Sequence, residues 1–446
     1  MTAAHALPIA AAPEVRPYRL TLVRIVEGST VVFLLFLLSS ALIGPLLDPR
    51  QLGGDTNPIL RLMWLPAYGL IFGLTVLRTP HLLRYWFPAL LLAGLVGLAF
   101  ASTQWSIDPA TSFRRSIAVA FTTLFGLYLA ASFTPRAMAE LLAITFLGLA
   151  VGSFAVSVAV PSLGVHSDVN AGAWKGLWYE KNQMGAIMVY GALSALAAAI
   201  TTPKRRWLWI GTIGLCTFLM LMTRSKTSLL CLMLVLGGAA GLAVVGRGAA
   251  TAVLAVWAGV TAAAAFGGMM LFAPDVLFEM LGKDPSLTGR TDIWAAVMRQ
   301  SDKSPTLGFG FAAFWGLQSA PAEWVRANTG WLVPTAHNGW LDLLVQLGWV
   351  GVTAMAVVLG LATLAAIWRF RVEGDGYWAI LYLAVFLLQS ASESFLLQQN
   401  SLAWVFAALA ISRVLGPLPH REPPATRPAP HRTRPPLAHG ASPSWG

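Results

Sequence analysis

The chain has 446 residues, of which 57% are hydrophobic and only 11% are charged, and its mean hydropathy is +0.67. Soluble globular domains carry about 25% charged residues, so this composition excludes a soluble protein and predicts an all-α polytopic membrane protein. The formal net charge is +11. We attribute this excess to membrane topology, as explained below, and expect no nucleic acid among the partners.

Twelve apolar runs, separated by charged clusters, predict about 12 transmembrane helices. The run over 339–368 is long enough to tilt or to begin outside the hydrocarbon. In chain order the runs are 29–47, 59–77, 85–101, 116–134, 139–160, 183–200, 207–223, 227–245, 249–272, 339–368, 376–392 and 397–415.

Basic residues in the short loops predict the orientation of these helices. If the N-terminus is cytoplasmic, the cytoplasmic side collects the whole positive excess, and acidic and basic residues balance on the other side. We therefore expect both termini in the cytoplasm and five segments. These are a cytoplasmic N-terminal segment (1–28), helices one to nine (29–272), one large periplasmic loop (273–338), the last three helices (339–415) and a disordered cytoplasmic tail (416–446).

The large loop is predicted to contain an amphipathic helix between Thr288 and Gln300. Thr291 or Asp292 can cap this helix, and one face carries an apolar set. Such a helix is expected on the membrane surface or on the ends of the spans. About 60 residues exceed a plain connector, and this length is typical of a lid or a functional site. The apolar set is Ile293, Trp294, Val297 and Met298.

The loop ends in a candidate general base. His337 precedes Asn338, a good N-cap, and then the apolar run that begins near Trp340. The positive end of the helix dipole favours a neutral imidazole, which is the form that a general base requires. The alternative is a histidine that only forms a hydrogen bond at the interface.

Four groups of basic residues are candidate binding groups for an anion. Arg290 precedes the predicted helix, where a guanidinium and backbone N–H groups suit a phosphate; alternatively it is solvated or paired with Asp292. Arg224 and Lys226 sit in a turn between two spans, where cations are costly unless they are paired, functional or snorkelling to headgroups. The other two groups are Arg114 with Arg115, in a polar segment outside the membrane, and Lys181 with Asn182 close to Trp174, which suits a sugar ring or an interface equally well.

Motifs for metal or nucleotide chemistry are absent from the sequence. It contains no His-Glu-x-x-His motif, no Cys/His cluster and no glycine-rich phosphate loop. We therefore expect no metal and no cofactor.

Taken together, several segments resemble the O-antigen ligase/polymerase superfamily, specifically its exopolysaccharide-polymerase branch. They run in the family's order across roughly residues 100–355. They are Trp105-Ser106-Ile107-Asp108-Pro109 with Arg114-Arg115, Trp174-Lys175-Gly176 with Lys181-Asn182-Gln183, Thr223-Arg224-Ser225-Lys226-Thr227, Leu287-Thr288-Gly289-Arg290, Gly308-Phe309-Gly310, and Ala336-His337-Asn338 with Gly348-Trp349-Val350-Gly351.

The resemblance implies a membrane glycosyltransferase with a GT-C-like fold in a bacterial inner membrane, with its active site facing the periplasm. Its substrates would be an undecaprenyl-pyrophosphate-linked glycan and a glycan acceptor, and its partners would be membrane lipids and other polysaccharide assembly proteins. By the same resemblance, Arg224 and Arg290 hold the pyrophosphate, with Lys226 and Lys181 as further donor-binding candidates, and His337 activates the acceptor hydroxyl. Transfer would be metal-independent and would invert the anomeric centre. Where many relatives have His-Lys-Asn, this chain has Glu180-Lys181-Asn182.

Three readings of the function remain open at this point. A polymerase would transfer the glycan to another lipid-linked repeat, and a ligase would transfer it to lipid A–core. A transporter or flippase would place ionisable residues near mid-membrane or break helices at matching points of two repeats. The predicted spans carry few internal charges and no visible repeat, which favours an enzyme over a transporter. Between the two enzymes, the Trp105-Ser106-Ile107-Asp108-Pro109 and Lys181-Asn182 segments favour the polymerase, with the ligase as the alternative.

Overall fold

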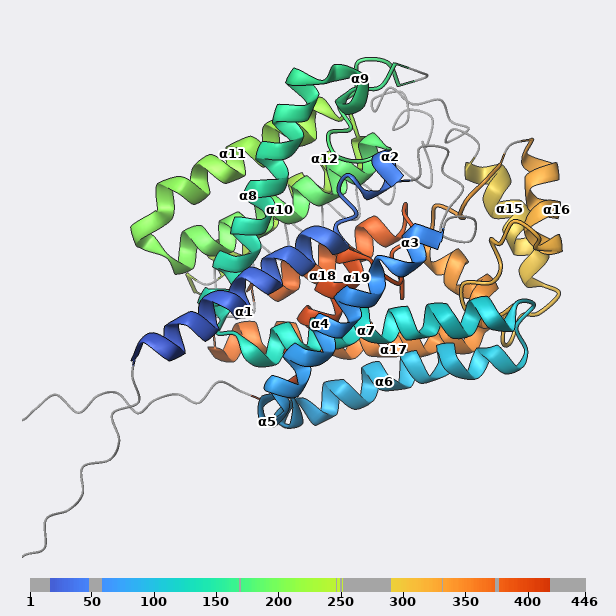
Figure 1. The fold of residues 1–446 in the computed structure, drawn as a ribbon, viewed down its shortest axis with the longest axis horizontal. Helices are drawn as coiled ribbons and strands as arrows, with labels where there is room; N and C mark the ends of the chain where they lie inside the picture. Colours follow the sequence, from blue (N-terminus) through green and yellow to red (C-terminus); the bar gives the residue numbers. More distant parts are fainter. Residues whose placement is uncertain are drawn as a thin grey trace, which may run out of the picture. The chain divides into compact units, whose positions relative to one another are not determined.

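The computed structural model describes residues 17–47, 58–167, 170–245, 247–248, 251, 290–330, 332–373 and 377–417. Over these ranges the structure is built from helices (Figure 1), and the β contact that it shows is an isolated bridge between Val165 and Trp174. Six helical stretches are long and apolar enough to cross a membrane, and three shorter apolar helices accompany them. These features support a polytopic, nearly all-helical membrane protein.

Each predicted apolar run that falls on described residues contains a helix, whereas 249–272 lies outside them apart from residue 251. Most of the predicted tail also lies outside, as do residues 273–289 of the predicted loop. The α-helices are α1 (Pro17–Leu38), α2 (Ile43–Leu47), α3 (Pro58–Leu62), α4 (Trp64–Leu77), α5 (Thr79–Leu82), α6 (Trp86–Ala101), α7 (Pro109–Ser132), α8 (Pro135–Ala159), α9 (Pro161–Gly164), α10 (Lys181–Thr201), α11 (Arg206–Met222), α12 (Lys226–Val245), α15 (Arg290–Ser301), α16 (Ala320–Thr329), α17 (Gly339–Glu373), α18 (Tyr377–Ser390) and α19 (Leu402–Leu415).

Some predicted boundaries were wrong. Helix α1 begins at Pro17 instead of 29, and α19 begins at Leu402 instead of 397. The residues just before α19 cannot continue a helix, because Leu397 and Asn400 both adopt positive φ angles, 52° and 54°. Residues 391–401 therefore form an irregular connector between α18 and α19, which we call the α18–α19 connector.

The start of α7 was also misplaced, at 116 instead of Pro109. Asp108 caps the helix by accepting a hydrogen bond from the Thr111 amide at 3.0 Å, and Pro109 occupies the first helical position. Burial opposes ionisation of Asp108, but its hydrogen bonds with Thr111 and the charges of Arg114 and Arg115 outweigh burial and lower its pKa. Arg114 and Arg115 are consequently helical residues and do not lie in a loop.

The helices pack closely where small residues allow it. In α7, a Cβ added to Gly126 would lie 2.6 Å from the Cβ of Ala408 and 2.7 Å from the carbonyl oxygen of Val405 in α19. Close approach of this kind is typical of helix pairs in membranes. In the same pair, Trp404 donates a hydrogen bond to Thr123 at 2.8 Å.

A buried charge pair links three helices at the end away from the large loop. Glu27 of α1 is 4% exposed and forms an ion pair with Arg78, which caps the C-terminus of α4. Tyr128 of α7 donates a further hydrogen bond to the same carboxylate at 2.6 Å. Because Glu27 has both partners, α1, α4 and α7 are tied together at this point.

Helix α17 is interrupted at Gly348, whose φ and ψ are 62° and −166°. The segment 304–312, which we call the loop strap, lies against this interruption. Its Phe309 and Gly310 amides donate to Val345 and Gln346 at 2.8 and 2.9 Å. The interruption also leaves two amides of α17 without partners in the helix, and carbonyls of the strap accept their hydrogen bonds. The Trp349 amide donates to Pro305 at 2.8 Å, and the Val350 amide donates to Thr306 at 3.2 Å.

The loop strap also binds the segment between α6 and α7. Trp105 donates from its indole to the carbonyl of Leu307 at 2.9 Å, and the Ile107 amide donates to Phe309 at 3.0 Å. One more bond comes from the side chain of Arg115, which donates to Ala312 at 3.0 Å. The strap therefore joins α7 to α17.

The described part of the large loop has a hydrophobic core of its own, built from α15, α16 and the first turns of α17. As predicted, Ile293 and Val297 of α15 are buried and Trp294 is partly buried, but Met298 is 41% exposed, so its assignment to that face was wrong. Thr291 and Asp292 lie within the first turn and do not cap it. The core consists of Ile293, Ala296, Val297, Phe314, Ala322, Val325, Val333, Ala336 and Val345.

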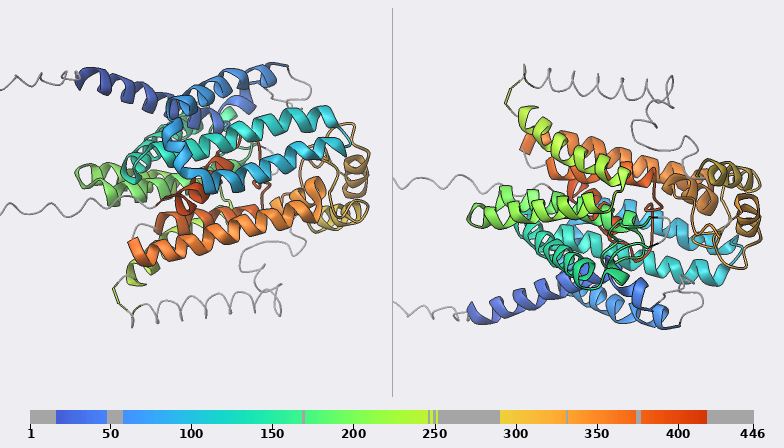
Figure 2. Two further views of the ribbon diagram at one scale, coloured as in Figure 1. Left: turned by 90° about the horizontal axis from the view of Figure 1, so that it is seen from below. Right: turned by 90° about the horizontal axis from the view of Figure 1, so that it is seen from above.

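A partly buried guanidinium organises the rest of this loop. Arg326 of α16 donates to the carbonyls of Trp315, Gly316 and Val333, at 2.8, 3.2 and 3.2 Å. Burial lowers the pKa of Arg326, with Glu323 acting in the opposite direction. Helix α16 packs on α15, and α15 packs on α17. The predicted amphipathic helix, α15, therefore covers the end of a span, as Figure 2 shows.

The interruption of α17 yields a prediction about stability. Gly348→Ala places a Cβ 2.2 Å from the carbonyl carbon of Thr306, in a backbone region that is essentially restricted to glycine. We expect a loss of roughly 1–3 kcal/mol and a lower unfolding temperature in detergent. Gly360→Ala in the same helix is the control, because its Cβ meets nothing within 4 Å. Equal unfolding temperatures for both variants would contradict the role of the interruption.

Candidate functional site

The candidate residues predicted from sequence gather at one end of the helices. Helices α7, α10, α12 and α17 all begin there, and α18 ends there, because successive long helices run in alternating directions (Figure 1). We call this the loop end. It holds seven of these residues at or near helix starts, namely Arg114, Arg115, Lys181, Asn182, Lys226, Arg290 and Asn338.

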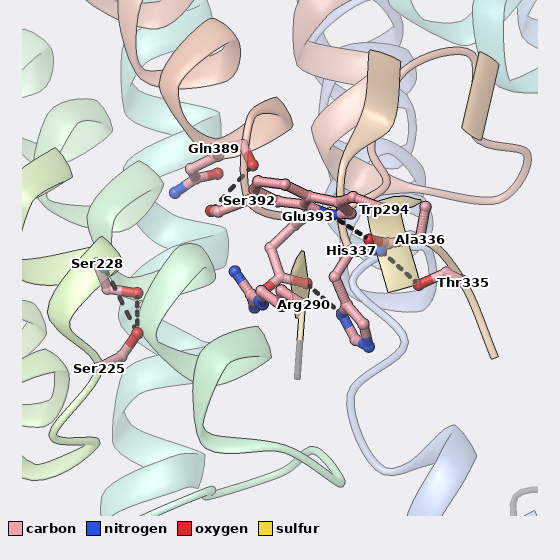
Figure 3. A network of polar contacts seen from close by, with 10 residues as sticks. All are labelled: Ser225, Ser228, Arg290, Trp294, Thr335, Ala336, His337, Gln389, Ser392 and Glu393. Atoms are coloured by element: carbon pink, nitrogen blue, oxygen red, sulfur yellow. Dashed lines mark hydrogen bonds and ion pairs between the residues drawn. The ribbon is translucent and has the colours of Figure 1, made fainter. Parts of the chain in front are cut away.

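His337, Glu393 and Arg290 form one group at the loop end (Figure 3). Nδ1 of His337 lies 3.6 Å from Oε2 of Glu393, and a guanidinium nitrogen of Arg290 lies 3.4 Å from Oε1 of the same carboxylate. The three side chains are 28%, 21% and 19% exposed. Arg290 is therefore neither fully solvated nor paired with Asp292, the two alternatives that the sequence left open.

The backbone around His337 is fixed from both sides. Its φ is 49°, a left-handed value that is uncommon for residues other than glycine. The preceding Ala336 donates its amide to the buried carboxylate of Asp342 at 3.0 Å and accepts a hydrogen bond from the indole of Trp294 at 2.9 Å. Such over-determined left-handed residues concentrate at functional sites.

Asn338 caps α17, as the sequence predicted. Its side-chain oxygen accepts from the amides of Trp340 and Leu341 at 3.0 and 3.3 Å. The imidazole of His337 therefore leaves the chain one residue before the start of a helix. Trp315 donates to Asp342 in the first turn of this helix at 2.6 Å, which ties the large loop to the same point.

The carboxylate of Glu393 selects what the imidazole can do. A carboxylate beside one ring nitrogen of a histidine stabilises a proton on that nitrogen and leaves the other nitrogen as the acceptor. With Glu393 at Nδ1, Nε2 of His337 is the nitrogen available to take a proton. The positive charge of Arg290 on the other oxygen compensates the carboxylate. Sequence spacing alone had assigned no role to Glu393.

Arg224 lies at the turn between α11 and α12, where its own φ is 54°. Its side chain is exposed and donates to the carbonyl of Ala171 at 3.4 Å, next to Gly172. Lys226 is the first residue of α12 and is partly buried. The turn thus holds both cations at the loop end, with Arg224 directed toward the 170–172 segment.

Lys181 and Asn182 open α10, and the structure places a histidine beside them. The Lys181 amide donates to Nε2 of His166 at 3.3 Å, and the same nitrogen lies 3.8 Å from a carboxylate oxygen of Glu180. His166 is 4% exposed. The sequence comparison with His-Lys-Asn relatives had assigned no histidine to this position, because residue 166 is distant along the chain.

Trp174 is partly buried and packs against two aromatic side chains. Its ring packs against Phe154 and Phe218, with centroids 6.1 and 5.9 Å away. Its amide donates to Met222 at 3.0 Å. These contacts attach the segment before α10 to α8 and α11.

A cavity of about 580 Å³ borders the α18–α19 connector, and sequence reasoning missed it. Its wall includes Arg114 and Arg115 of α7, Gln183 of α10 and the 398–401 part of the α18–α19 connector. The signal in the sequence was the run Gln398-Gln399-Asn400-Ser401 between two apolar stretches, which the prediction placed inside the last span. Among the described residues, no three His, Cys, Asp or Glu side chains are grouped so that they could hold a metal ion.

Comparison with known proteins supports the resemblance seen in the sequence. Residues 211–356 match a family described as "O-Antigen ligase", and this range contains Arg224, Arg290 and His337. The chain is also 31% identical over 163 residues to the exopolysaccharide production protein ExoQ of Rhizobium meliloti (strain 1021). The aligned region covers 33% of this chain and 36% of the relative. The match thus spans about a third of that protein's length. The resemblance of this chain to the O-antigen ligase family and to exopolysaccharide production proteins is confirmed.

Proposed function

We propose that the protein is a membrane glycosyltransferase of polysaccharide biosynthesis that polymerises oligosaccharide repeats carried on undecaprenyl pyrophosphate. It would lie in the inner membrane with its loop end facing the periplasm and both termini in the cytoplasm. The observation that carries the proposal is the His337–Glu393–Arg290 group, which combines a base-capable imidazole with a guanidinium. The matches to the O-antigen ligase family and to an exopolysaccharide production protein support it.

In the proposed reaction, the hydroxyl oxygen of the acceptor sugar attacks the anomeric carbon of the donor. The new C–O bond forms as the bond between that carbon and the pyrophosphate oxygen breaks, and the electron pair leaves with the pyrophosphate. Nε2 of His337 takes the hydroxyl proton. Attack opposite the leaving group inverts the anomeric centre. The donor arrives already activated, so the transfer requires no nucleotide sugar and no metal.

The cations of the loop end have the role of stabilising the leaving group. Charge develops on the pyrophosphate during transfer, and fixed cations in a water-poor site stabilise such charge strongly. Arg290 and Arg224 are the main groups in this proposal, with Lys226 and Lys181 at neighbouring helix starts. Arg290 is held by Glu393 at 3.4 Å and would share its guanidinium between this carboxylate and the phosphate.

Glu393 is a positioning residue in this mechanism. It contacts neither substrate in the proposal, and it acts by orienting the imidazole of His337 and the guanidinium of Arg290. Misplacing a catalytic group by about 1 Å can cost up to about 100-fold in rate.

The ligase is a second candidate, favoured by the family description "O-Antigen ligase". It would use the same residues and a different acceptor, lipid A–core. In a strain that lacks the protein, separate profiles of the lipid-linked and the surface glycans distinguish a polymerase from a ligase. We expect single repeat units stranded on the carrier and no long chains. Long chains stranded on the carrier would instead identify a ligase, and an unchanged profile would contradict both.

Removing the base should abolish transfer. We expect His337→Ala to lower the transfer rate by about 10²- to 10⁴-fold, measured as polymer formed by purified protein from a lipid-linked donor. His81→Ala is the matched control, because His81 is an exposed histidine of α5. Full activity of His337→Ala at equal membrane levels would disprove the base assignment.

Loss of the positioning carboxylate should act through His337. We expect Glu393→Gln to lower kcat by about 10- to 100-fold. Glu393→Asp keeps the carboxylate and should lower kcat less. In the double variant with His337→Ala, Glu393→Gln should cost little more, because residues that act as a unit are not additive. Glu323→Gln, at an exposed carboxylate of α16, is the control. Additive losses would show that Glu393 acts independently of the imidazole.

A further inference from the structure

The cavity that borders the α18–α19 connector is amphipathic. We call it the arginine cavity, after Arg114 and Arg115. Its polar wall combines these guanidinium groups with amides and hydroxyls, and its apolar wall is formed mainly by α3, α4 and the end of α1. The polar lining includes Tyr68, Gln183, Gln398, Gln399, Asn400 and Ser401.

The two guanidinium groups give the polar wall its chemistry. Arg114 and Arg115 are partly buried, in the second turn of α7. Arg114 donates to the hydroxyl of Thr111 at 3.3 Å, and Arg115 donates to the carbonyl of Ala312 at 3.0 Å. A guanidinium has five N–H donors and suits bidentate binding of phosphate. Adjacent, partly buried arginines in a cavity wall are therefore suited to a phosphate-bearing ligand.

The apolar wall extends to the outer surface of the helices. Leu62 and Leu65 line the cavity and are 61% and 59% exposed. In a membrane protein, exposed leucines of this kind face lipid. Leu60 and Trp64 continue the same wall. A ligand with a phosphate head and a hydrocarbon tail can thus place its head at the arginines and its tail along α3 and α4.

The α18–α19 connector separates this cavity from the His337 group. Glu393, near one end of the connector, contacts His337 and Arg290, and Gln398 to Ser401, at the other end, line the cavity. Asn400 fixes this wall, because its side chain accepts from Tyr68 at 2.9 Å and its amide donates to Thr122 at 2.9 Å. Two sites on one connector are suitably placed to bring two substrates together.

We propose that the arginine cavity binds a second polyprenyl pyrophosphate lipid, the acceptor of the transfer. This inference rests on the proposed function, since that reaction joins two lipid-linked saccharides. Arg114 and Arg115 hold the acceptor's pyrophosphate, the tail lies along Leu60 to Leu65, and the amide-rich connector faces the saccharide. The donor pyrophosphate binds separately at Arg224 and Arg290.

The test counts bound lipids by native mass spectrometry of the purified protein with undecaprenyl pyrophosphate as the probe. We expect two bound lipids in the wild type. Arg114→Gln should weaken one of them by about ten- to a hundredfold, and Arg114→Lys should restore part of the binding. Arg299→Gln is the control, because Arg299 is an exposed arginine of α15 at the same end. Arg115 is left intact, since it also holds the loop strap.

The outcomes separate this inference from the proposed function. Retention of two lipids by Arg114→Gln, at an unchanged unfolding temperature, overturns the acceptor site. Equal displacement of the second lipid by phosphatidylglycerol also overturns it, because the cavity then takes ordinary phospholipid. If Arg290→Gln leaves both lipids bound while Arg114→Gln removes one, the donor assignment fails and the acceptor site stands.

Discussion

The backbone pairing between the loop strap and the interruption of α17 is the constraint on which the loop end depends. A helix broken at Gly348 exposes amides and carbonyls that cannot stay unpaired in an apolar setting. Four hydrogen bonds from residues 305–310 satisfy several of these groups. The same strap binds Trp105 and Arg115 at its other side. One irregular segment thereby sets the distance between α7 and α17, and with it the positions of Arg115 and His337.

Charge at the loop end is organised around shared acceptors. Glu393 lies between a guanidinium and an imidazole, and Asp342 accepts from both the Ala336 amide and the Trp315 indole. In each case one buried or half-buried carboxylate joins the large loop to a span. The acidic groups therefore position the large loop, and the cationic groups are the ones that we propose to contact the substrates.

Hydropathy predicted the helices well because a span must be apolar over most of its length, and this can be read from sequence alone. The ends were less accurate, since they depend on caps and on backbone conformation. Asp108 with Pro109 gave a recognisable cap that places the start of α7 earlier than the apolar run does. The positive φ angles at Leu397 and Asn400 have no comparable signal, because neither residue is glycine.

The candidate site was predictable residue by residue, but its connections were not. His337, Arg290 and Asn338 follow from their places beside helix starts. The link from His337 to Glu393 joins α17 to the α18–α19 connector, and nothing in the sequence encodes that proximity. The contact of His166 with Lys181 is similarly non-local. The number of spans, the sidedness and the tail structure remain predictions.

Helix α4 is held unequally at its two ends. At one end Arg78 is joined to the buried Glu27, and breaking such a buried pair costs roughly 3–5 kcal/mol. Nearer the other end, beside the arginine cavity, Tyr68 donates a neutral hydrogen bond to Asn400, typically about 1 kcal/mol, and stacks on Phe121 with ring centroids 4.9 Å apart. The strongest polar contact of α4 is therefore at its Arg78 end, and the part of the helix that borders the cavity is held by weaker contacts. The wall that α4 contributes to the cavity is thus its less firmly held part.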